Sequence, residues 1–308
     1  MQKEKPALLS SIAILHADKR KMTSEFLYYT LKSPIVKKDV RENYGSGSAI
    51  PRIVLKDFRR MPIEFPSIEE QKRITSICEI IDSKIKTNTA INKNLEEQIF
   101  SLYRETISTH DCSQIKLGNL CTFQEGYVNP PQGHAEYFDG GVKWLRAVDI
   151  NESYIINTSR TLTRKGFDSA KKSALLFEPD TIAISKSGTI GRLGLVGDFM
   201  RGNRAVINIK PNDKVLLTFL YAFLKSKQTD FPELAVGSVQ KNLYVSLLEP
   251  LVVKMPSNEV LTSLCKRINS NLDMIKSNCF ENNTLIVLRD TLLPRLMSGE
   301  IDVSNIEV

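Results

Sequence analysis

The sequence has few residues of the kinds that staple small folds or bind metals. It contains five cysteines, one tryptophan and three histidines in 308 residues. No two cysteines form a CxxC pair, and the histidines (His16, His110 and His134) are scattered along the chain. This pattern excludes a disulfide framework and a clustered zinc site, and it is typical of reduced thiols in the cytoplasm.

Long hydrophobic runs are also lacking. No stretch approaches the roughly 18 unbroken apolar residues that span a bilayer, so no membrane association is expected. The charged start and short apolar run of residues 1–17 raise the alternative of a signal peptide, but the repeat described below favours a strand there. No GxxxxGKS/T phosphate loop and no group of acid, base and nucleophile stands out, so we predict no catalytic residues.

Positive charge is in excess. Lys and Arg number 42 against 35 Asp and Glu, which gives a net charge of +7 and a pI near 9.0. Such a balance favours a polyanionic partner such as nucleic acid, although many basic proteins bind none. The length, with 42% hydrophobic and 25% charged residues, predicts a globular chain with room for two ordinary domains.

An internal repeat links the two halves of the chain. FLYYTLKS at 26–33 and FLYAFLKS at 219–226 share six of eight letters and lie 193 positions apart (219 − 26 = 193). Each is followed by a segment that opens on Gly-Ser and closes on Pro, at 47–66 and 237–256. The apolar rhythm of 10–26 and 205–219 predicts a strand, a polar turn and a helix start. The two Gly-Ser segments predict a short helix and then a strand.

A long helical pattern follows each closing proline. Apolar residues and asparagines recur at alternating steps of four and three, as at the a and d positions of a coiled coil. The predicted seams are Ile74, Cys78, Ile81, Ile85, Asn88, Asn92, Leu95, Ile99 and Leu102 on the first helix, and Leu261, Leu264, Ile268, Leu272, Ile275, Cys279, Asn282 and Ile286 on the second.

Neither helix can bury its seam alone, so we expect the two to pair. The domain between them makes an antiparallel arrangement feasible. Asparagine on a seam costs stability but fixes register and partner; the alternative is that these asparagines face solvent.

The region between the helices combines strand-like runs, at 143–150, 181–185, 193–197 and 205–210, with glycine-rich turns and a late helix. This predicts the α+β class: a mixed domain joined to two long helices paired as an antiparallel coiled coil. The predicted divisions are 1–66 (a partial copy of the domain), 67–111 (first helix), 112–256 (complete domain) and 257–308 (second helix and tail). Aligning Ile14 with Ile207 puts Met1 opposite Gly194, so about 80 residues of the domain (194 − 114 = 80) have no counterpart in the first copy.

The complete domain carries the candidate DNA-binding chemistry. Residues 114–256 contain 18 Lys and Arg against 13 Asp and Glu, a local net charge of +5. Glycines allow close approach of DNA, cations bind phosphates, and Arg and Asn can recognise guanine and adenine edges. The predicted DNA-contacting residues are Lys186, Ser187, Thr189, Arg192, Arg201, Asn203, Arg204, Gln240, Lys241 and Asn242.

Structural alternatives stand beside this prediction. The glycines of 188–194 can serve as turns between strands, the arginines can be solvated, and 240–242 can cap a helix. The lone Trp144 is interpreted as a core residue rather than a base-stacking platform.

Five phrases in this order of elements are similar to the specificity subunit of Type I restriction–modification systems. They are PSIEEQKRITSICEIIDSKI (66–85), IKLGNLCTFQEG (115–126), SKSGTIGRLGLV (185–196), GSVQKNLYVSLLEPLVVKMP (237–256) and LRDTLLPRLMSGEI (288–301). The resemblance covers essentially the whole chain.

The resemblance implies a non-catalytic subunit whose two target-recognition domains each bind one half of a split sequence in double-stranded DNA. The paired helices would space the domains and dock two methyltransferase (modification) subunits. Those partners use S-adenosylmethionine, and restriction or translocase subunits can join them. No cofactor or metal is expected in this chain itself, and the complex is expected in the cytoplasm.

The first domain departs from the family pattern, because only its final part is present. The chain is then a natural truncation, a fragment, or a half-type subunit that pairs with a second copy or with another specificity subunit. The alternative function is a truncated scaffold that docks methyltransferase or a sibling specificity subunit without recognising DNA.

Overall fold

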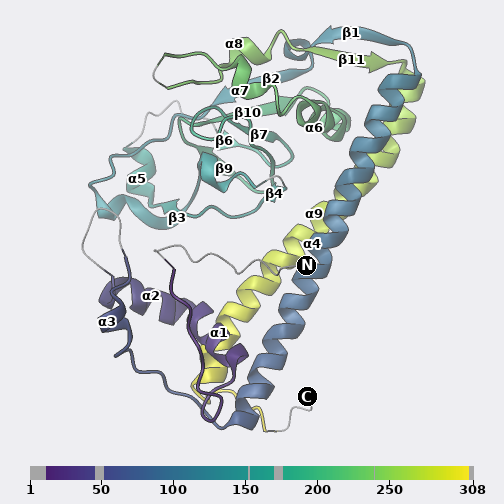
Figure 1. Cartoon of the computed structure of the whole chain (residues 1–308). Coiled ribbons are helices and arrows are strands. Elements are labelled where there is room, and N and C mark those ends of the chain that lie inside the picture. The colour runs from purple at the N-terminus through teal and green to yellow at the C-terminus, as the bar shows by residue number, and fades with distance from the viewer. Residues whose placement is uncertain (1–11, 46–51, 152, 170–175, 239, 305–308) are drawn as a thin grey trace, which may run out of the picture. The chain divides into compact units, whose positions relative to one another are not determined.

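The structure is a computed structural model that describes residues 12–45, 52–151, 153–169, 176–238 and 240–304 (Figure 1). The chain divides into two compact units. Unit 1 comprises residues 1–86 and 284–308, and unit 2 comprises residues 87–283. Two long helices, α4 (Ile68–Thr109) and α9 (Asn258–Met297), each contribute one part to either unit.

Unit 2 is built around a five-stranded sheet with the order β2-β10-β7-β8-β4. Its strands are β2 (Cys121–Glu125), β4 (Tyr154–Ile155), β7 (Ile182–Ser185), β8 (Leu193–Val196) and β10 (Val206–Pro211). The central strand β10 is antiparallel to both of its neighbours, pairing Ile207 with Glu125 on one side and with Ile184 on the other. Because β7, β8 and most of β10 are buried, they appear in the sequence as short continuous apolar runs.

A second sheet has the order β5-β3-β9-β6. Its strands are β3 (Phe138–Leu145), β5 (Thr161–Leu162), β6 (Leu176–Phe177) and β9 (Met200–Gly202). Trp144 lies in its core with 2% of its surface exposed, and its indole N–H donates to the carbonyl oxygen of Val128 at 2.8 Å. The interpretation of Trp144 as a core residue therefore agrees with the structure.

Helix α6 (Leu217–Ser226) holds the second copy of the repeated phrase and packs against the five-stranded sheet (Figure 1). Every residue from Leu217 to Leu224 is buried. The remaining short helices of unit 2 are α5 (Arg164–Asp168), α7 (Phe231–Leu234), α8 (Val245–Leu248) and the 3-10 turns 117–119, 135–137, 147–149 and 214–216. The helix and strand predicted after the Gly-Ser turn are present here as α8 and β11 (Val252–Pro256).

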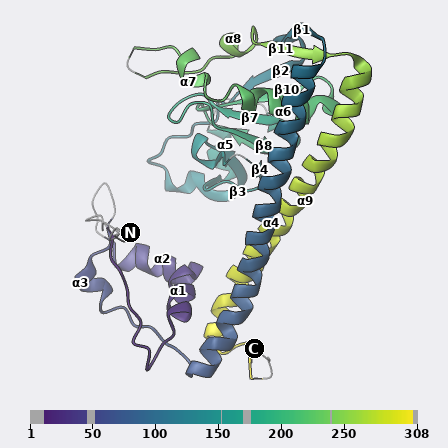
Figure 2. The ribbon, with the colours of Figure 1, turned by 45° about the vertical axis from the view of Figure 1, so that its right-hand side comes forward.

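Within unit 2 the long helices run in opposite directions. The side-chain amide of Asn88 donates to the Oδ1 atom of Asn282 at 2.9 Å, and Asn278 donates to Asn92 Oδ1 at 2.8 Å, so rising numbers on α4 meet falling numbers on α9 (Figure 2). Beyond α4, β1 (Cys112–Lys116) pairs antiparallel with β11, which immediately precedes α9, with Cys112 opposite Pro256. This ladder ties together the end of one helix and the start of the other.

The predicted seam residues lie along the contact between α4 and α9. Buried positions are Ile74, Cys78, Ile81, Asn88, Ile99, Leu264, Ile268, Leu272 and Ile275; half-buried positions are Ile85, Asn92, Leu95, Leu102, Leu261, Cys279 and Asn282. Ile286, the last residue of the second pattern, is 39% exposed. Asn88 is 1% exposed and hydrogen-bonded, so the solvent-facing alternative is wrong for that residue.

Unit 1 contains α1 (Ser24–Lys32), α2 (Pro34–Asn43), α3 (Leu55–Phe58) and the remaining parts of α4 and α9. Ser67 and Glu70 form a capping box that fixes the start of α4. Buried Gln71 accepts from the Thr23 backbone N–H and donates to the Pro66 carbonyl at 2.9 Å, which joins three segments of the unit. Phe26 and Tyr29 of α1 complete a small apolar cluster with Ile74 and Leu293.

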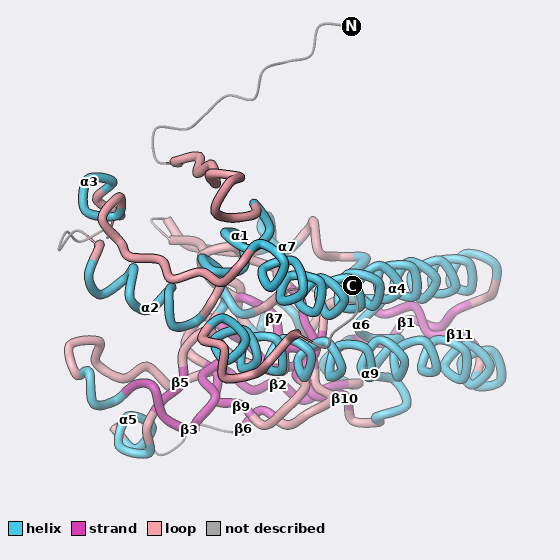
Figure 3. Tube along the Cα trace, turned by 90° about the horizontal axis from the view of Figure 1, so that it is seen from below, coloured by secondary structure: helices cyan, strands magenta, loops and turns pink. Residues whose placement is uncertain are grey.

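Two strands predicted in the first repeat copy are absent from the described residues. Residues 12–17 and 61–66 form neither a helix nor a strand, while 10–11 and the Gly47-Ser48 turn lie outside the described residues (Figure 3). The second copy explains why. In the second copy the aligned strand β10 pairs with β2 and β7, and β11 pairs with β1, whereas 12–17 and 61–66 have no such pairing partners among the described residues. A strand needs neighbours to pair its backbone groups, and the apolar pattern of the repeat does not supply them.

All five cysteines are free thiols. Burial raises the pKa of Cys78 and Cys265 to about 11 and that of Cys121 to about 12, so these three are unreactive core residues. In the described part of the chain, no helix is both long and apolar enough to cross a membrane.

Candidate nucleic-acid interface

Three strand termini of the five-stranded sheet meet at one edge of unit 2. β2 and β7 both run antiparallel to β10, so their last residues lie beside its first residues. Glu125 ends β2, Lys186 directly follows β7, and Arg204 lies two residues before β10. This topology brings together side chains that are about 80 positions apart in the sequence (204 − 125 = 79).

A fourth segment joins the same edge from the end of the domain. Val236 and Asn242 exchange two backbone hydrogen bonds across a tight loop, and the backbone N–H of Leu243 donates to the Lys186 carbonyl at 2.9 Å. Gly237 adopts φ +137° in this loop, and a Cβ there would lie 2.3 Å from the Gln240 carbonyl oxygen. Glycine is therefore required for the loop that carries the Gln240-Lys241-Asn242 cluster.

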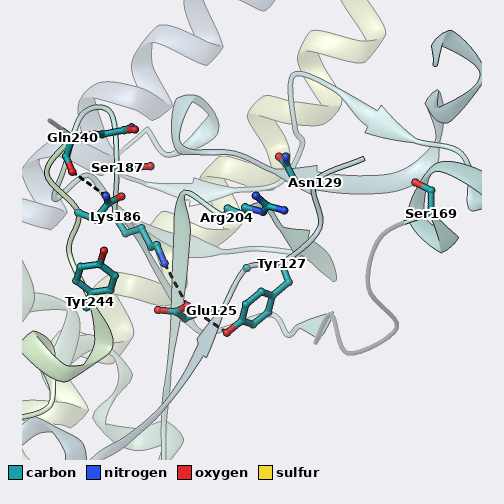
Figure 4. Close-up of a pocket in the computed structure, with 11 residues that line it drawn as sticks. Glu125, Tyr127, Asn129, Ser169, Lys186, Ser187, Arg204, Gln240 and Tyr244 are labelled. Atoms are coloured by element: carbon teal, nitrogen blue, oxygen red, sulfur yellow. Dashed lines mark hydrogen bonds and ion pairs between the residues drawn. The ribbon is translucent and has the colours of Figure 1, made fainter. Parts of the chain in front are cut away.

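These segments enclose a polar pocket of about 650 Å³ (Figure 4). Its described lining consists of Glu125, Gly126, Tyr127, Asn129, Ser169, Lys186, Ser187, Arg204, Gln240, Asn242 and Tyr244. Five of the ten predicted DNA-contacting residues are in this set: Lys186, Ser187, Arg204, Gln240 and Asn242. The pocket combines amide, hydroxyl, cationic and aromatic groups, which is the chemistry of a surface that binds a polar, anionic polymer.

Lys186 is the most constrained cation of the pocket. Its ammonium nitrogen lies 3.3 Å from Glu125 Oε2 and 5.5 Å from the centre of the Tyr244 ring, and its side chain is 14% exposed. Its backbone N–H also donates to the Ala205 carbonyl at 2.8 Å. Lys186 therefore holds three segments together as well as supplying charge.

Arg204 is different, because it is exposed and forms no hydrogen bond or ion pair with another described residue. It lies in a turn stabilised by Asn203, whose side-chain oxygen accepts from the Ala205 backbone N–H at 3.0 Å. The amide oxygen of Asn203 is thus engaged locally, whereas the Arg204 guanidinium faces the pocket without a competing partner (Figure 4). Such a cation is available to a phosphate or a base edge.

The other predicted residues lie outside the pocket lining. Arg201 lies in strand β9, and its guanidinium lies 4.6 Å from the centre of the Phe167 ring. Desolvation and the nearby Arg164 lower the pKa of Arg201. Thr189 and Lys241 are exposed at loop positions, and Arg192 is half-buried directly before β8.

For the glycines of 188–194 and for residues 240–242, the structure distinguishes between the alternative interpretations. Gly188 and Gly191 adopt φ values of +74° and +85°, as turn glycines do, and Gly194 is packed against Ile155 within β8. Residues 240–242 do not cap a helix, because the N-cap of α8 is Tyr244. The glycines of this segment therefore shape the loop and the sheet.

Sequence reasoning missed Glu125, Tyr127, Asn129, Ser169 and Tyr244. The first three alternate in the FQEGYVN stretch (123–129), of which the family-like phrase 115–126 contains only the part up to Gly126. Gly126 connects them to the site, since a Cβ there would lie 2.0 Å from the Asn203 carbonyl oxygen. This close approach of two backbone segments is a tertiary contact, which the sequence does not reveal directly. The sequence signal that could have indicated these pocket residues was the Glu-Gly-Tyr step at the end of a strand-like run.

With this geometry in place, comparison with known proteins identifies the class of the chain. Residues 3–97 and 110–284 match the family described as "Type I restriction modification DNA specificity domain". The match covers most of the sequence, so the chain belongs to this family. The family is defined by DNA specificity and not by catalysis, in agreement with the prediction that the chain is not an enzyme.

Individual relatives agree with this assignment. The chain is 28% identical over 176 residues to the Type I restriction enzyme HindI specificity subunit of Haemophilus influenzae, a match that covers 56% of this chain and 38% of the relative. It is 21% identical over 309 residues to the Type I restriction enzyme MjaIX specificity subunit of Methanocaldococcus jannaschii, covering 92% and 71%.

A solved structure supports the fold. The crystal structure of the S subunit of a Type I restriction–modification system from M. genitalium superposes with a TM-score of 0.52 at 20% identity, covering 91% of this chain and 74% of that one. The mixed α/β domain and the long helices are therefore the architecture of this family, as the sequence predicts.

Proposed function

We propose that the chain is a DNA-sequence specificity subunit of a Type I restriction–modification complex, and that unit 2 recognises one part of a split DNA target. The observation that carries this proposal is the convergence of Lys186, Arg204 and the 236–243 loop on one polar pocket at the sheet edge. Family membership makes DNA the expected ligand, and the local excess of positive charge suits it.

We further propose that the paired helices dock methyltransferase subunits, which would hold the S-adenosylmethionine, in the cytoplasm. Exposed apolar side chains on these helices support a protein partner: Ile80 is 71% exposed, Met274 54% and Val287 55%. Isolated apolar residues are common on surfaces, but on a pair of solvent-facing helices they supply the contact area that docking needs.

The same exposed residues favour the second candidate, a scaffold that docks methyltransferase or a sibling specificity subunit without binding DNA. The two functions differ in whether the pocket contributes to DNA affinity.

The discriminating variant is Arg204→Ala combined with Lys241→Ala, which removes two exposed cations from the proposed DNA-facing side. If unit 2 contacts DNA there, the complex with methyltransferase should bind duplexes more weakly, and the slope of log affinity against log salt should fall by about 1 for each lost phosphate contact. The matched control is Lys254→Ala, because Lys254 is an exposed cation on β11 that belongs neither to the pocket lining nor to the 240–242 cluster beside it.

Gel retardation over a salt series measures both quantities, and size-exclusion chromatography reports assembly. Unchanged DNA affinity with intact assembly would exclude the pocket as a DNA site and favour the scaffold. Equal losses in the double variant and in Lys254→Ala would indicate a diffuse charge effect without a site.

A further inference from the structure

The pocket contains a carboxylate that its proposed role as a cationic DNA site does not explain. Glu125 is the only acidic residue among the described residues of the lining (Figure 4). A negative charge facing DNA repels phosphates and lowers the affinity for every sequence. A group with that cost needs a compensating role, either in the structure or in recognition.

The structural role of Glu125 accounts for one of its two oxygens. The Lys186 ammonium lies 3.3 Å from Oε2, and the Tyr127 hydroxyl donates to the same atom at 3.4 Å. Oε1 accepts no hydrogen bond from any other described residue, and the side chain is 24% exposed. An ionised carboxylate can accept about four hydrogen bonds, so Oε1 remains available to a ligand in the pocket.

The backbone of Glu125 is held in the sheet, and its side chain is held by the ion pair with Lys186. Glu125 is paired with Ile207 in the sheet, and the next residue, Gly126, donates its N–H to the Val206 carbonyl at 2.9 Å. The ion pair with Lys186 then limits rotation of the side chain. An acceptor held at a strand end by a sheet, a close glycine contact and an ion pair is preorganised for one geometry.

We propose, on the basis of the function proposed above, that Glu125 is a specificity-determining residue that accepts a hydrogen bond from the exocyclic amino group of a base in the major groove. Only cytosine N4 and adenine N6 offer such a donor there, whereas guanine and thymine present acceptor oxygens that a carboxylate repels. Glu125 therefore selects cytosine or adenine at one position of the target and disfavours guanine and thymine.

The ion pair between Lys186 and Glu125 also has a role in this proposal. Lys186 offsets the charge of Glu125 within the pocket, which limits the repulsion of nearby phosphates. Arg204 remains free for phosphate or base contact, so the two cations of the lining have separate tasks.

The test compares base preferences of the full chain, wild type and Glu125→Gln, by selection from randomised duplexes. The wild type should prefer an amino-bearing base at one position by about fivefold or more, which corresponds to ~1 kcal/mol, the lower end of the range for bidentate base contacts, because a single oxygen accepts here. In Glu125→Gln this preference should largely disappear, because an amide both donates and accepts. Affinity for duplexes with the wrong base should rise, because a repulsive charge has been removed.

Two further variants separate recognition from structure. Glu125→Asp keeps the charge and should retain the preference for an amino-bearing base with weaker binding. Lys186→Met removes the ion pair but leaves the acceptor, so it should weaken binding to all sequences and keep the same preferred base with a smaller ratio. If Glu125→Gln instead weakens all duplexes equally and keeps the wild-type preference, Glu125 only positions Lys186 and the proposal is wrong.

A test on the DNA side does not depend on the folding of any variant. In the selected duplex, cytosine is replaced by 2-pyrimidinone or adenine by purine, which removes only the exocyclic amino group. Wild-type binding should fall at least about fivefold at the Glu125 position, and the result shows which base is recognised. No loss at any position would overturn the proposal. Absence of any base preference in the wild type would instead overturn the proposed function itself.

Discussion

The two copies of the repeat show how the same sequence pattern behaves in two surroundings. Ile207 and Tyr221 of the second copy are 0% and 2% exposed, whereas their aligned partners Ile14 and Tyr28 are 59% and 55% exposed. Both copies form the helix of the shared phrase, α1 and α6, but only the second forms the strand before it. Helix formation depends on local sequence and one packed face, whereas a strand depends on its neighbours.

The two helices are also held by different forces. α6 is buried over eight successive residues against the sheet and the long helices of unit 2. α1 buries only Phe26, Tyr29 and Thr30, and it is joined to α4 by polar contacts to Asp82. Asp82 accepts from the Tyr29 hydroxyl at 3.1 Å and from the Lys32 ammonium at 2.8 Å, and it also pairs with Arg289 of α9.

The largest effect is expected from Phe219→Ala, compared with the aligned change Phe26→Ala. Phe219 is fully buried in the large core and lies 5.3 Å, centre to centre, from the Tyr103 ring. Its truncation should destabilise unit 2 by about 3–5 kcal/mol, whereas the smaller cluster around Phe26 can relax and should lose about 3 kcal/mol or less. Amide hydrogen exchange of α6 and α1 measures the two effects separately.

An equal loss in both helices would contradict the comparison, because it would mean that α1 is packed as completely as α6. Phe199→Ala is a suitable control in unit 2, since Phe199 is 55% exposed and should change the stability by less than about 0.5 kcal/mol.

This contrast also marks how far sequence reasoning extends. The long helices were predictable to within a few residues because their heptads continue for several turns and begin after a Pro-Ser capping signal. The strand predicted at 12–17 has the right apolar pattern, but none of the described segments pairs with it. The pocket was half-predictable, because Lys186 and Arg204 lie in a basic, glycine-rich segment, whereas Glu125 and Tyr127 join it only through pairing between β2 and β10.

The next largest effect on stability is expected from the polar contacts of α1, which, unlike α6, packs against no described sheet. Arg289→Met leaves Asp82 without its buried partner, and the Arg289 side chain is only 9% exposed. We expect a loss of about 2 kcal/mol in unit 1, less than the ~3–5 kcal/mol of a fully buried pair because Asp82 keeps some contact with water. Hydrogen exchange of the α1 backbone amides measures this loss of stability. The control is Arg295→Met, which breaks the exposed ion pair with Glu300 and should have little effect.

Acid should reproduce part of this loss. Burial acts to raise the pKa of Asp82, but hydrogen bonds from Lys32 and Arg289 outweigh it and hold that pKa below its ordinary value of 3.8. A carboxyl with a depressed folded-state pKa stabilises the fold above its unfolded pKa, and the contribution is lost as pH falls below about 4. Protection of α1 should therefore fall below that pH in the wild type and change less in Arg289→Met. Identical pH profiles would show that the contact contributes nothing.

The smallest effect on stability is expected at the contact between α4 and α9 that equivalent asparagines of the two repeats form. Asn88 and Asn92 of α4 align with Asn278 and Asn282 of α9 at the 190-residue offset of the closing prolines (256 − 66 = 190). The two bonded pairs, Asn88 with Asn282 and Asn278 with Asn92, are thus related by the repeat. Hydrogen-bonded asparagines on a seam favour one register over others, and here they do so through a symmetric set.

The symmetry is incomplete in one respect, which gives a prediction. Asn88 is 1% exposed and also donates to Glu281 Oε2 at 2.7 Å, whereas Asn278 is only half-buried. Asn88→Ala should therefore cost about 1–2 kcal/mol, because it leaves polar partners unpaired, and Asn278→Ala less than about 1 kcal/mol.

Thermal unfolding of the two variants, with the exposed Asn94→Ala as control, measures the difference. In the double variant Asn88→Ala with Asn282→Ala, both members of one pair are absent, so its cost should be smaller than the sum of the two single costs. Strict additivity would mean that the two amides do not interact. Equal costs for Asn88→Ala and Asn278→Ala would mean that the extra bond to Glu281 is without consequence, and that the repeat alone determines the strength of this contact.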